Sequence, residues 1–279
     1  MVPGSLTESP QTLLDSPRRE DALIRLDQIR VSYALKNGAR KTVLDGIDLD
    51  IRAGEFISVI GQTGCGKSTL LRLVLGSEMP TEGRVLVEGR EVLRPDRDRG
   101  YVPQKYSLFP DKTVIDNITF GLEVEEFSLL ACFTPRYYSR RREFRAEAHR
   151  QLARMGLHET DAAKYPDQLS GGMQQRVAIA QALVMKPKIL LMDEAFSALD
   201  PGTRAGMQKL IREVWKETGT TVLFVTHNIA EAVRLATRVI VLAKDPTAEG
   251  SRVALDLSTA EPDIAIRIRE ATGHSDLEP

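Results

Sequence analysis

A glycine-rich loop directly after an apolar segment constrains the fold of this chain more than any other feature of its sequence. The apolar residues Phe56-Ile57-Ser58-Val59-Ile60 predict a buried strand. The loop that follows matches the pattern G-x-x-x-x-G-K-[ST] and reads Gly61-Gln62-Thr63-Gly64-Cys65-Gly66-Lys67-Ser68-Thr69. A helix is expected over residues 68–75. Strand, loop and helix together predict a phosphate-binding unit of an α/β fold.

The chemistry of this loop suits ATP or another nucleoside triphosphate, bound together with Mg²⁺. Glycine permits the backbone angles that turn successive N–H groups toward one anion. Lys67 adds a positive charge near the β- and γ-phosphates, and the Ser68 hydroxyl is a ligand for Mg²⁺. The positive end of the helix dipole adds to the attraction. A glycine-rich turn with a surface lysine is the plain alternative, and the full match in its strand–loop–helix context disfavours it.

Strand and helix patterns alternate along the rest of the chain and predict an α/β core with a parallel sheet. Two longer strand candidates, residues 24–35 and 43–51, precede the loop and predict an N-terminal antiparallel β-layer. Residues 113–157 have apolar side chains at helical spacing. Further helices are expected at 171–185 and 202–217, and further strands at 84–87, 100–103, 188–192 and 221–226.

The composition is that of an ordinary globular chain. Of 279 residues, 42% are hydrophobic and 28% are charged, and the net charge is −1, which gives no global attraction to nucleic acid or to an anionic membrane. No stretch approaches the ~20 apolar residues that a membrane span needs. Residues 1–22 are expected to be a disordered leader and 259–279 a C-terminal tail. Two cysteines, Cys65 and Cys132, favour a reducing compartment such as the cytosol.

A second short segment, Leu169-Ser170-Gly171-Gly172-Met173-Gln174-Gln175-Arg176, lies where a helix is expected to begin. Ser170 follows Lys67 by 103 positions. Its hydroxyl and the free N–H groups of the helix start form a second anion site. One nucleotide rarely needs two such sites from distant parts of a chain. A serine N-cap followed by flexible glycines is the plain alternative for the tripeptide alone.

Together, the two segments closely resemble the phosphate loop and the signature of ATP-binding cassette (ABC) ATPases. The resemblance extends over residues 24–257. It implies a P-loop NTPase core with a parallel sheet, the N-terminal antiparallel β-layer, and an inserted α-helical subdomain at about residues 105–185, all within one ATPase domain at 23–258. In that family each signature closes over the nucleotide held by the partner's phosphate loop. The resemblance therefore implies a dimer in which Ser170, Gly171 and Gly172 bind the partner's ATP.

The segment Ile189-Leu190-Leu191-Met192-Asp193-Glu194 resembles the second nucleotide motif of the family, a buried strand that ends in two carboxylates. Strand ends of this architecture face the ligand crevice, so Asp193 is expected to hold Mg²⁺ and Glu194 to orient the attacking water. Capping of the next helix is the plain alternative. Ala195 stands where proline often follows the glutamate, and loss of proline's fixed φ is expected to loosen this turn.

The resemblance assigns four more residues. Gln104, in Tyr101-Val102-Pro103-Gln104, is similar to the glutamine that contacts Mg²⁺, and His227 to the switch histidine that contacts the γ-phosphate. Asp200 resembles the aspartate that reaches across the dimer interface, and Tyr33 the aromatic residue that stacks on adenine. Taken singly, each residue has a plain alternative. Gln104 can belong to an ordinary turn and His227 can be a structural histidine. Asp200 can be a helix cap and Tyr33 a packed aromatic residue.

The least ordinary stretch, residues 126–145, is a long connection within the helical region. It interleaves basic and aromatic side chains: Arg136, Tyr137, Tyr138, Arg140, Arg141, Arg142, Phe144 and Arg145. Such a composition can stack on bases and bind phosphates, or rest on lipid headgroups or on a membrane protein. A solvated basic helix is the plain alternative. The resemblance favours contact with a permease or with the membrane surface.

These observations predict an ATPase subunit that energises a membrane importer. Since no span is expected in the chain, separate integral membrane permease subunits are implied, with a solute-binding protein as a further candidate partner. The motifs look most like those of the nitrate, sulfonate and taurine importer group, which implies a small anionic or organic solute and a peripheral position on the cytoplasmic face of a bacterial inner membrane. The alternative is a non-transport ABC ATPase that acts on nucleic acid or ribosomes, although no nucleic acid is expected as a partner.

Overall fold

One ten-stranded sheet organises the computed structural model, which describes residues 22–36, 38–105, 107–127, 135–244 and 249–272. The predicted leader, apart from residue 22, and Cys132 therefore lie outside the described residues. The strands are β1 (Ala22–Ala34), β2 (Arg40–Arg52), β3 (Phe56–Gly61), β4 (Glu82–Val87), β5 (Arg90–Glu91), β6 (Arg99–Val102), β7 (Ile189–Asp193), β8 (Thr221–Val225), β9 (Arg238–Lys244) and β10 (Ser251–Ser258). The helices are α1 (Lys67–Leu75), α2 (Val114–Glu126), α3 (Pro135–Arg154), α4 (Gly171–Leu183), α5 (Pro201–Thr218), α6 (Ile229–Leu235) and α7 (Ile264–Thr272). Two 3-10 turns, Glu159–Asp161 and Pro166–Gln168, lie between α3 and α4.

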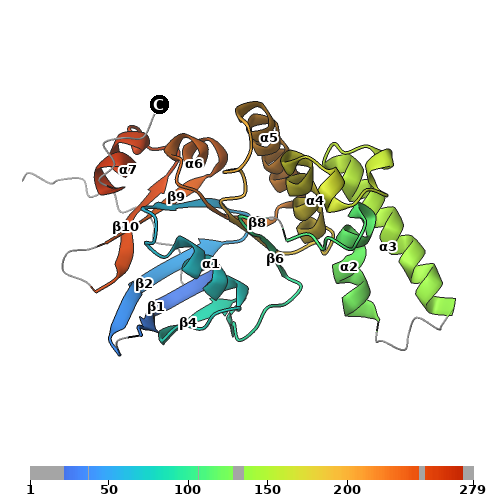
Figure 1. Cartoon of the computed structure of the whole chain (residues 1–279). Helices are drawn as coiled ribbons and strands as arrows, with labels where there is room; N and C mark the ends of the chain where they lie inside the picture. The colour runs from blue at the N-terminus through green and yellow to red at the C-terminus, as the bar shows by residue number, and fades with distance from the viewer. Residues whose placement is uncertain (1–21, 37, 106, 128–134, 245–248, 273–279) are drawn as a thin grey trace, which may run out of the picture.

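The sheet has an antiparallel part and a parallel part (Figure 1), in the order β5-β4-β1-β2-β10-β9-β3-β8-β7-β6. β1 and β2 pair antiparallel, with opposed apolar residues such as Leu26 and Leu49 buried. β4 continues the antiparallel pairing on the other side of β1. A single parallel pair between Ser251 of β10 and Leu44 of β2 joins this layer to the rest of the sheet. The predicted N-terminal antiparallel β-layer is confirmed.

The parallel part consists of β9, β3, β8, β7 and β6, which all run in the same direction. Every residue of β3, β7 and β8 is buried. Strands with this near-continuous apolar character are typical of parallel sheets that are covered on both faces. Because the strands are parallel, the carboxyl ends of β3, β6, β7 and β8 meet at one edge. The predicted α/β core is confirmed, and this edge is where its ligands are expected.

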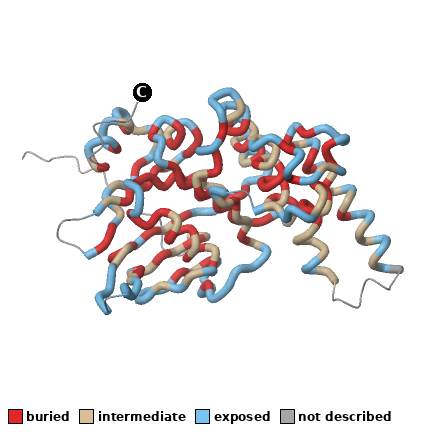
Figure 2. Tube along the Cα trace, viewed as in Figure 1, coloured by how far each residue is buried: buried red, intermediate tan, exposed pale blue. Residues whose placement is uncertain are grey.

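Three helices, α2, α3 and α4, form a separate block beside the parallel part (Figure 1). Val114, Ile118, Leu152 and Val177 belong to its buried core, which continues under the sheet to Phe56. α2 and α3 extend away from this core, and Figure 2 shows mostly half-buried and exposed residues along their outer parts. The predicted helical insertion is thus present. Among the described residues, no helix is both long and apolar enough to cross a bilayer.

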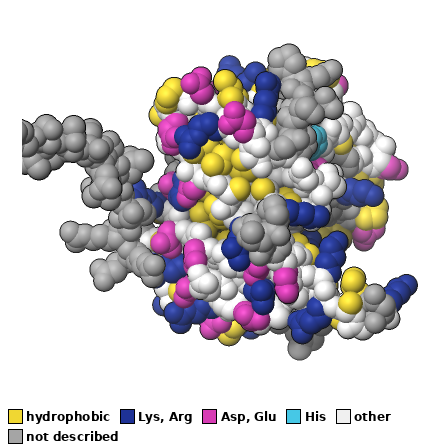
Figure 3. Space-filling model, turned by 90° about the vertical axis from the view of Figure 1, so that its left-hand side faces the viewer, with side chains coloured by type: hydrophobic (Ala, Val, Ile, Leu, Met, Phe, Trp, Pro, Cys, Tyr) yellow, Lys and Arg dark blue, Asp and Glu magenta, His cyan; other side chains and the backbone are white. Residues whose placement is uncertain are grey.

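The C-terminal part adds four elements that the strand and helix patterns did not predict, namely α6, β9, β10 and α7. β9 and β10 pair antiparallel, and α7 packs on them and on α6. Ile264 and Ile268 of α7 lie one turn apart and are buried. The segment that we expected to be a tail therefore contributes to the core. On the side of the molecule shown in Figure 3, acidic and basic side chains are interspersed around apolar ones.

Candidate ATP-binding and hydrolysis site

The phosphate-binding loop connects β3 to α1, as the sequence predicts. Gly66 caps α1 with a φ of 99°, in the left-handed region that favours glycine. Gly61 allows a close approach, since a Cβ there would lie 2.3 Å from the Leu242 backbone oxygen and 2.5 Å from Cys65 Sγ. Because the cap is a glycine, no side chain bonds to the first N–H groups of α1. These groups remain for an anion at the positive end of the helix.

Lys67 points into this loop. Its side chain is almost fully buried, and Nζ donates to the backbone oxygens of Gly61 at 2.7 Å and Gln62 at 3.1 Å. A buried ammonium group needs such partners because removal from water is costly. The loop thus holds a positive charge at its centre, and phosphate oxygens can take over the contacts that the carbonyl oxygens now make.

Ser68 and Asp193 meet across the site. Ser68 Oγ donates to Asp193 Oδ1 at 3.0 Å, although 125 positions separate the two residues. Burial raises the pKa of the Asp193 carboxyl, and the charge of Glu194 adds to the rise, whereas the Ser68 bond and the cations Arg72 and Lys67 oppose it. A cation would relieve this unfavourable burial of negative charge. A hydroxyl and a carboxylate are hard oxygen ligands, so the pair fits Mg²⁺.

Few protein ligands are available for that ion. The described residues contain no cluster of three or more His, Cys, Asp or Glu side chains arranged to hold a metal. This agrees with Mg²⁺ chemistry, in which one or two carboxylates act with substrate phosphates and water. Ser68 and Asp193 would hold the ion, Gln104 stays a predicted further ligand, and the ion's contribution would be to neutralise charge on the phosphates.

Glu194 lies at the end of β7 between Gln104 and His227. Gln104 Nε2 donates to Glu194 Oε2 at 2.8 Å, and His227 Nδ1 lies 3.6 Å from Oε1. A small cavity of about 40 Å³ adjoins Glu194 and His227, with room for a water molecule. The structure therefore brings together three predicted catalytic side chains from the ends of three different strands.

Several hydrogen bonds hold the turn at Glu194, and the loosening expected from Ala195 stays a prediction. Glu194 has a φ of 44°, which is uncommon for a residue with a side chain. Its N–H donates to the Val225 oxygen at 2.9 Å, and its own oxygen accepts from the N–H and the hydroxyl of Ser197 at 3.0 and 2.9 Å. Ala195 is itself buried. These bonds fix the position of the turn at a place where no proline ring fixes φ.

Ser170 and Asp200 each cap the start of a helix. Ser170 caps α4 by accepting from Met173 N at 3.3 Å, and its side chain is exposed. Asp200 caps α5 by accepting from the N–H groups of Gly202 and Thr203, and the Thr203 bonds lower its pKa. Figure 1 shows α4 in the helical block, apart from α1. Both plain capping interpretations are correct, and both helix starts remain open toward solvent.

Gly172 links the signature to the region around Asp200. A Cβ on Gly172 would lie 2.7 Å from Thr203 Cγ2, so the start of α4 packs tightly against α5. A side chain at position 172 would have to displace the Thr203 methyl group. The signature and the Asp200 turn therefore belong to one surface, distinct from the phosphate loop.

Tyr33 lies at the end of β1 above α1. Its hydroxyl contacts the Glu78 carboxylate and lies 3.4 Å from Thr69 Oγ1, while 39% of the residue is exposed. These contacts fix the ring next to the phosphate loop. Stacking on adenine stays a prediction.

Sequence reasoning missed the groups that support the catalytic side chains. Tyr101 OH lies 3.5 Å from Asp193 Oδ2. Behind His227, Thr226 donates its hydroxyl to buried Glu231, which also accepts from Gln208 Nε2 at 2.9 Å. For Thr226, the one signal in the sequence was its position directly before His227. The sequence carried no signal for Glu231.

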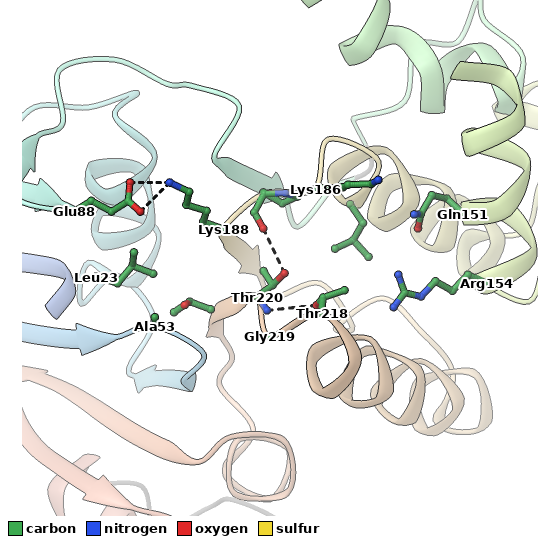
Figure 4. Close-up of a pocket in the computed structure, with 13 residues that line it drawn as sticks. Leu23, Ala53, Glu88, Gln151, Arg154, Lys186, Lys188, Thr218, Gly219 and Thr220 are labelled. Carbon is green, nitrogen blue, oxygen red and sulfur yellow. Dashed lines mark hydrogen bonds and ion pairs between the residues drawn. The ribbon is translucent and has the colours of Figure 1, made fainter. Parts of the chain in front are cut away.

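A larger cavity of about 500 Å³ lies at the opposite, amino-terminal edge of the strands (Figure 4). Two of its lining cations are already paired. Lys188 Nζ lies 2.8 Å from both carboxylate oxygens of Glu88, and Arg154 contacts Glu217. None of the predicted site residues lines this cavity. Its volume therefore does not identify it as the nucleotide site.

Known proteins resemble this chain over most of its length. A family model described as ABC transporter matches residues 44–197. An uncharacterized ABC transporter ATP-binding protein of Methanocaldococcus jannaschii is 40% identical, covering 90% of this chain and 92% of that protein. A taurine import ATP-binding protein of Rhizobium johnstonii is 42% identical, covering 84% of each. A bicarbonate transport ATP-binding protein of Synechococcus elongatus is 44% identical over 82% of this chain, which spans only 33% of that relative.

A solved structure gives the same fold. The dimeric, post-hydrolysis state of an ATP-binding cassette bound to ADP and Pi has a TM-score of 0.72 and 32% identity, covering 85% of this chain and 99% of that one. The family model spans more than half of the sequence, and the full-length archaeal relative exceeds 30% identity. This chain belongs to the ABC transporter ATPase family.

Proposed function

We propose that this chain binds and hydrolyses ATP as one half of a cassette dimer, and that closure and opening of the dimer drive a membrane importer. One observation carries the proposal. Glu194 lies between Gln104 and His227, directly after the Asp193 that bonds Ser68 of the phosphate loop. The side chains that we propose as base and γ-phosphate contact therefore lie at the same edge of the sheet as the phosphate loop.

The first step is ATP binding to the open loop. Lys67 exchanges its bonds to the loop carbonyls for bonds to phosphate oxygens, and the free N–H groups at the start of α1 bind the same chain of phosphates. The exposed Tyr33 ring, held by Glu78, is placed for contact with adenine. No covalent bond is broken in this step.

The second step is closure of the dimer. Ser170 and Gly171 are exposed at the start of α4, and their helix end carries a positive dipole. Together with Asp200, this surface completes the site of the partner copy by covering its ATP. The existence of a dimeric cassette structure with ADP and Pi supports this arrangement.

The third step is hydrolysis. Glu194 accepts a hydrogen bond from the attacking water and orients it toward the γ-phosphorus, and His227 donates to a γ-phosphate oxygen. Glu194 takes the proton that the water loses, the water oxygen forms the new P–O bond, and the bond to ADP breaks with its electron pair passing to the ADP oxygen. Phosphate then leaves, and the contacts across the interface are lost.

The transport assignment rests on the relatives. The taurine and bicarbonate proteins support a small anionic or organic solute. Since the described helices cannot cross a bilayer, we propose separate permease subunits, a peripheral position on the cytoplasmic face of the membrane, and a solute-binding protein as a further partner.

ATP titration of the purified chain tests the nucleotide site. Lys67→Ala should weaken ATP binding about a hundredfold, because two charge-assisted bonds to phosphate are lost. Lys209→Ala is the matched control, since Lys209 is exposed on α5 and should bind ATP like the wild type. Equal affinity of the two variants would contradict the assigned site.

Purification from membranes tests the transport role. A tagged full-length chain should copurify with integral membrane subunits, and their identity defines the solute. Copurification of ribosomes or nucleic acid in their place would refute the importer assignment while leaving the ATPase assignment intact.

A further inference from the structure

The carboxyl end of α7 contacts the phosphate-binding loop. Gln62 Nε2 donates to the backbone oxygen of Thr272 at 2.8 Å, across 210 positions of the chain. Thr272 is the last residue of α7 and is 4% exposed. The last carbonyl groups of a helix have no partner within that helix. Gln62 therefore caps α7, and α7 in turn holds the side chain of a loop residue.

Apolar packing extends this contact to both sides of the site. Ile264 and Ile268 of α7 belong to one buried cluster with Ile60 and Ile229. Ile60 immediately precedes the phosphate loop, and Ile229 begins α6, two positions after His227. The same helix thus supports the end of β3 and the start of α6.

Gln62 is also a point at which Lys67 is held. The backbone oxygen of Gln62 accepts from Lys67 Nζ at 3.1 Å and from Cys65 N at 3.2 Å. Lys67 can leave this oxygen when its ammonium group turns toward phosphate. The bond to Thr272 restrains Gln62 independently of Lys67, so the loop has a second support when the lysine turns away.

We propose that α7 positions the phosphate loop for ATP, with Gln62 and Ile268 as positioning residues. This inference rests on the proposed ATP binding. A loop that is already ordered loses less conformational freedom when its ligand binds. Loss of the α7 support should therefore weaken ATP binding about two- to tenfold. This range corresponds to the net free energy that one hydrogen bond contributes.

Two isoleucines of α7 provide a matched pair of variants in the full-length chain. Ile268 is 0% exposed, whereas Ile266 is 53% exposed. Ile268→Ala should raise the ATP dissociation constant and the KM for ATP about two- to tenfold, with kcat changed less than twofold. Ile266→Ala should change none of these values. Ile268→Val removes one methyl group and keeps the test available if the alanine variant does not fold.

A double variant separates support by α7 from direct contact with the nucleotide. If Gln62 acts through α7, Gln62→Ala combined with Ile268→Ala should weaken binding no more than the stronger single change, since both remove the same support. Fully additive effects would overturn the inference. So would Ile268 variants that melt at lower temperature yet bind ATP as tightly as Ile266→Ala. Failure of the wild type itself to bind ATP would refute the proposed function instead.

Discussion

The nucleotide edge of the sheet and the α2–α3 pair both concentrate charged side chains, but they leave different groups available. At the nucleotide edge, within the part of the chain that the structure describes, Lys67 bonds only to backbone oxygens, and Glu194 is contacted by the amide of Gln104 and by His227. None of these contacts is a close ion pair that would neutralise the charge of Lys67 or of Glu194. The edge can therefore exchange its contacts for those of ATP.

In the α2–α3 pair, most of the basic side chains are already neutralised by acidic ones. The ion pairs are Arg140 with Glu126 at 2.8 Å, Arg141 with Glu123 at 3.1 Å and Arg145 with Asp116 at 2.7 Å. The pKa of Glu126 is lowered, chiefly by its hydrogen bond to Arg140. Phe127 packs edge-on against Tyr137, with ring centres 4.8 Å apart. The interleaved basic and aromatic residues thus bind the neighbouring helix.

The comparison shows that a basic segment is not by itself a binding surface. Arg142 is exposed and has no ion pair among the described residues, and the exposed Arg136 makes only a 3.4 Å contact with Glu126. These two side chains are the ones that remain available for a permease or a lipid headgroup. Contact of this stretch with the membrane stays a prediction, and residues 128–134 lie outside the described residues.

The nucleotide edge should show the largest effect of a single change. Glu194→Gln should lower the rate of ATP hydrolysis about 10²- to 10⁴-fold, because the glutamine cannot accept the proton of the attacking water. ATP binding should persist, and an ATP-bound dimer should accumulate. Phosphate release and light scattering measure the two outcomes. Glu213→Gln, an exposed change on α5, is the control, and hydrolysis by Glu194→Gln at the control's rate would exclude Glu194 as the base.

The α2–α3 pair should respond in stability instead. Arg145→Ala should lower the free energy of unfolding by about 1 kcal/mol, or the melting temperature by about 3 °C, because Asp116 loses its closest cation and keeps only the longer contact with Arg141 at 3.6 Å. Arg142→Ala should leave the melting temperature unchanged. If Arg142→Ala alone reduced copurification with membrane subunits, the available basic groups would be a contact surface. An equal loss of stability in both variants would remove the distinction drawn above.

A smaller effect is expected from Asp193 in the absence of nucleotide and Mg²⁺. Burial raises its folded-state pKa, so the folded chain binds more protons than the unfolded chain just above pH 4. Stability is therefore greatest below the unfolded pKa and falls as pH rises through the folded pKa. Asp193→Asn should melt about 2 °C higher than the wild type at pH 7, with the difference vanishing near pH 4. A difference independent of pH would mean that the charge is not its cause.

Much of the fold and the site was predictable because the necessary residues are contiguous. The phosphate loop, the signature and the strand that ends in Asp193 each fit within nine residues, and periodicity marked their flanking elements. The supporting residues were not predictable in this way. Thr226, Glu231 and Gln208 form one network, but nothing in their local patterns distinguishes them from ordinary polar positions.

The sequence by itself determined which local units exist: a loop with the pattern of a phosphate-binding loop, a capped helix start with two glycines, and two carboxylates at a strand end. Only the tertiary structure decided which units meet. Parallel strand pairing brings Gln104 to Glu194 across 90 positions, the helix pairing gives the arginines of α3 their acidic partners, and α7 reaches Gln62. The physical reason is that backbone propensity and periodicity are local, whereas a side chain's partners depend on strand order and helix packing.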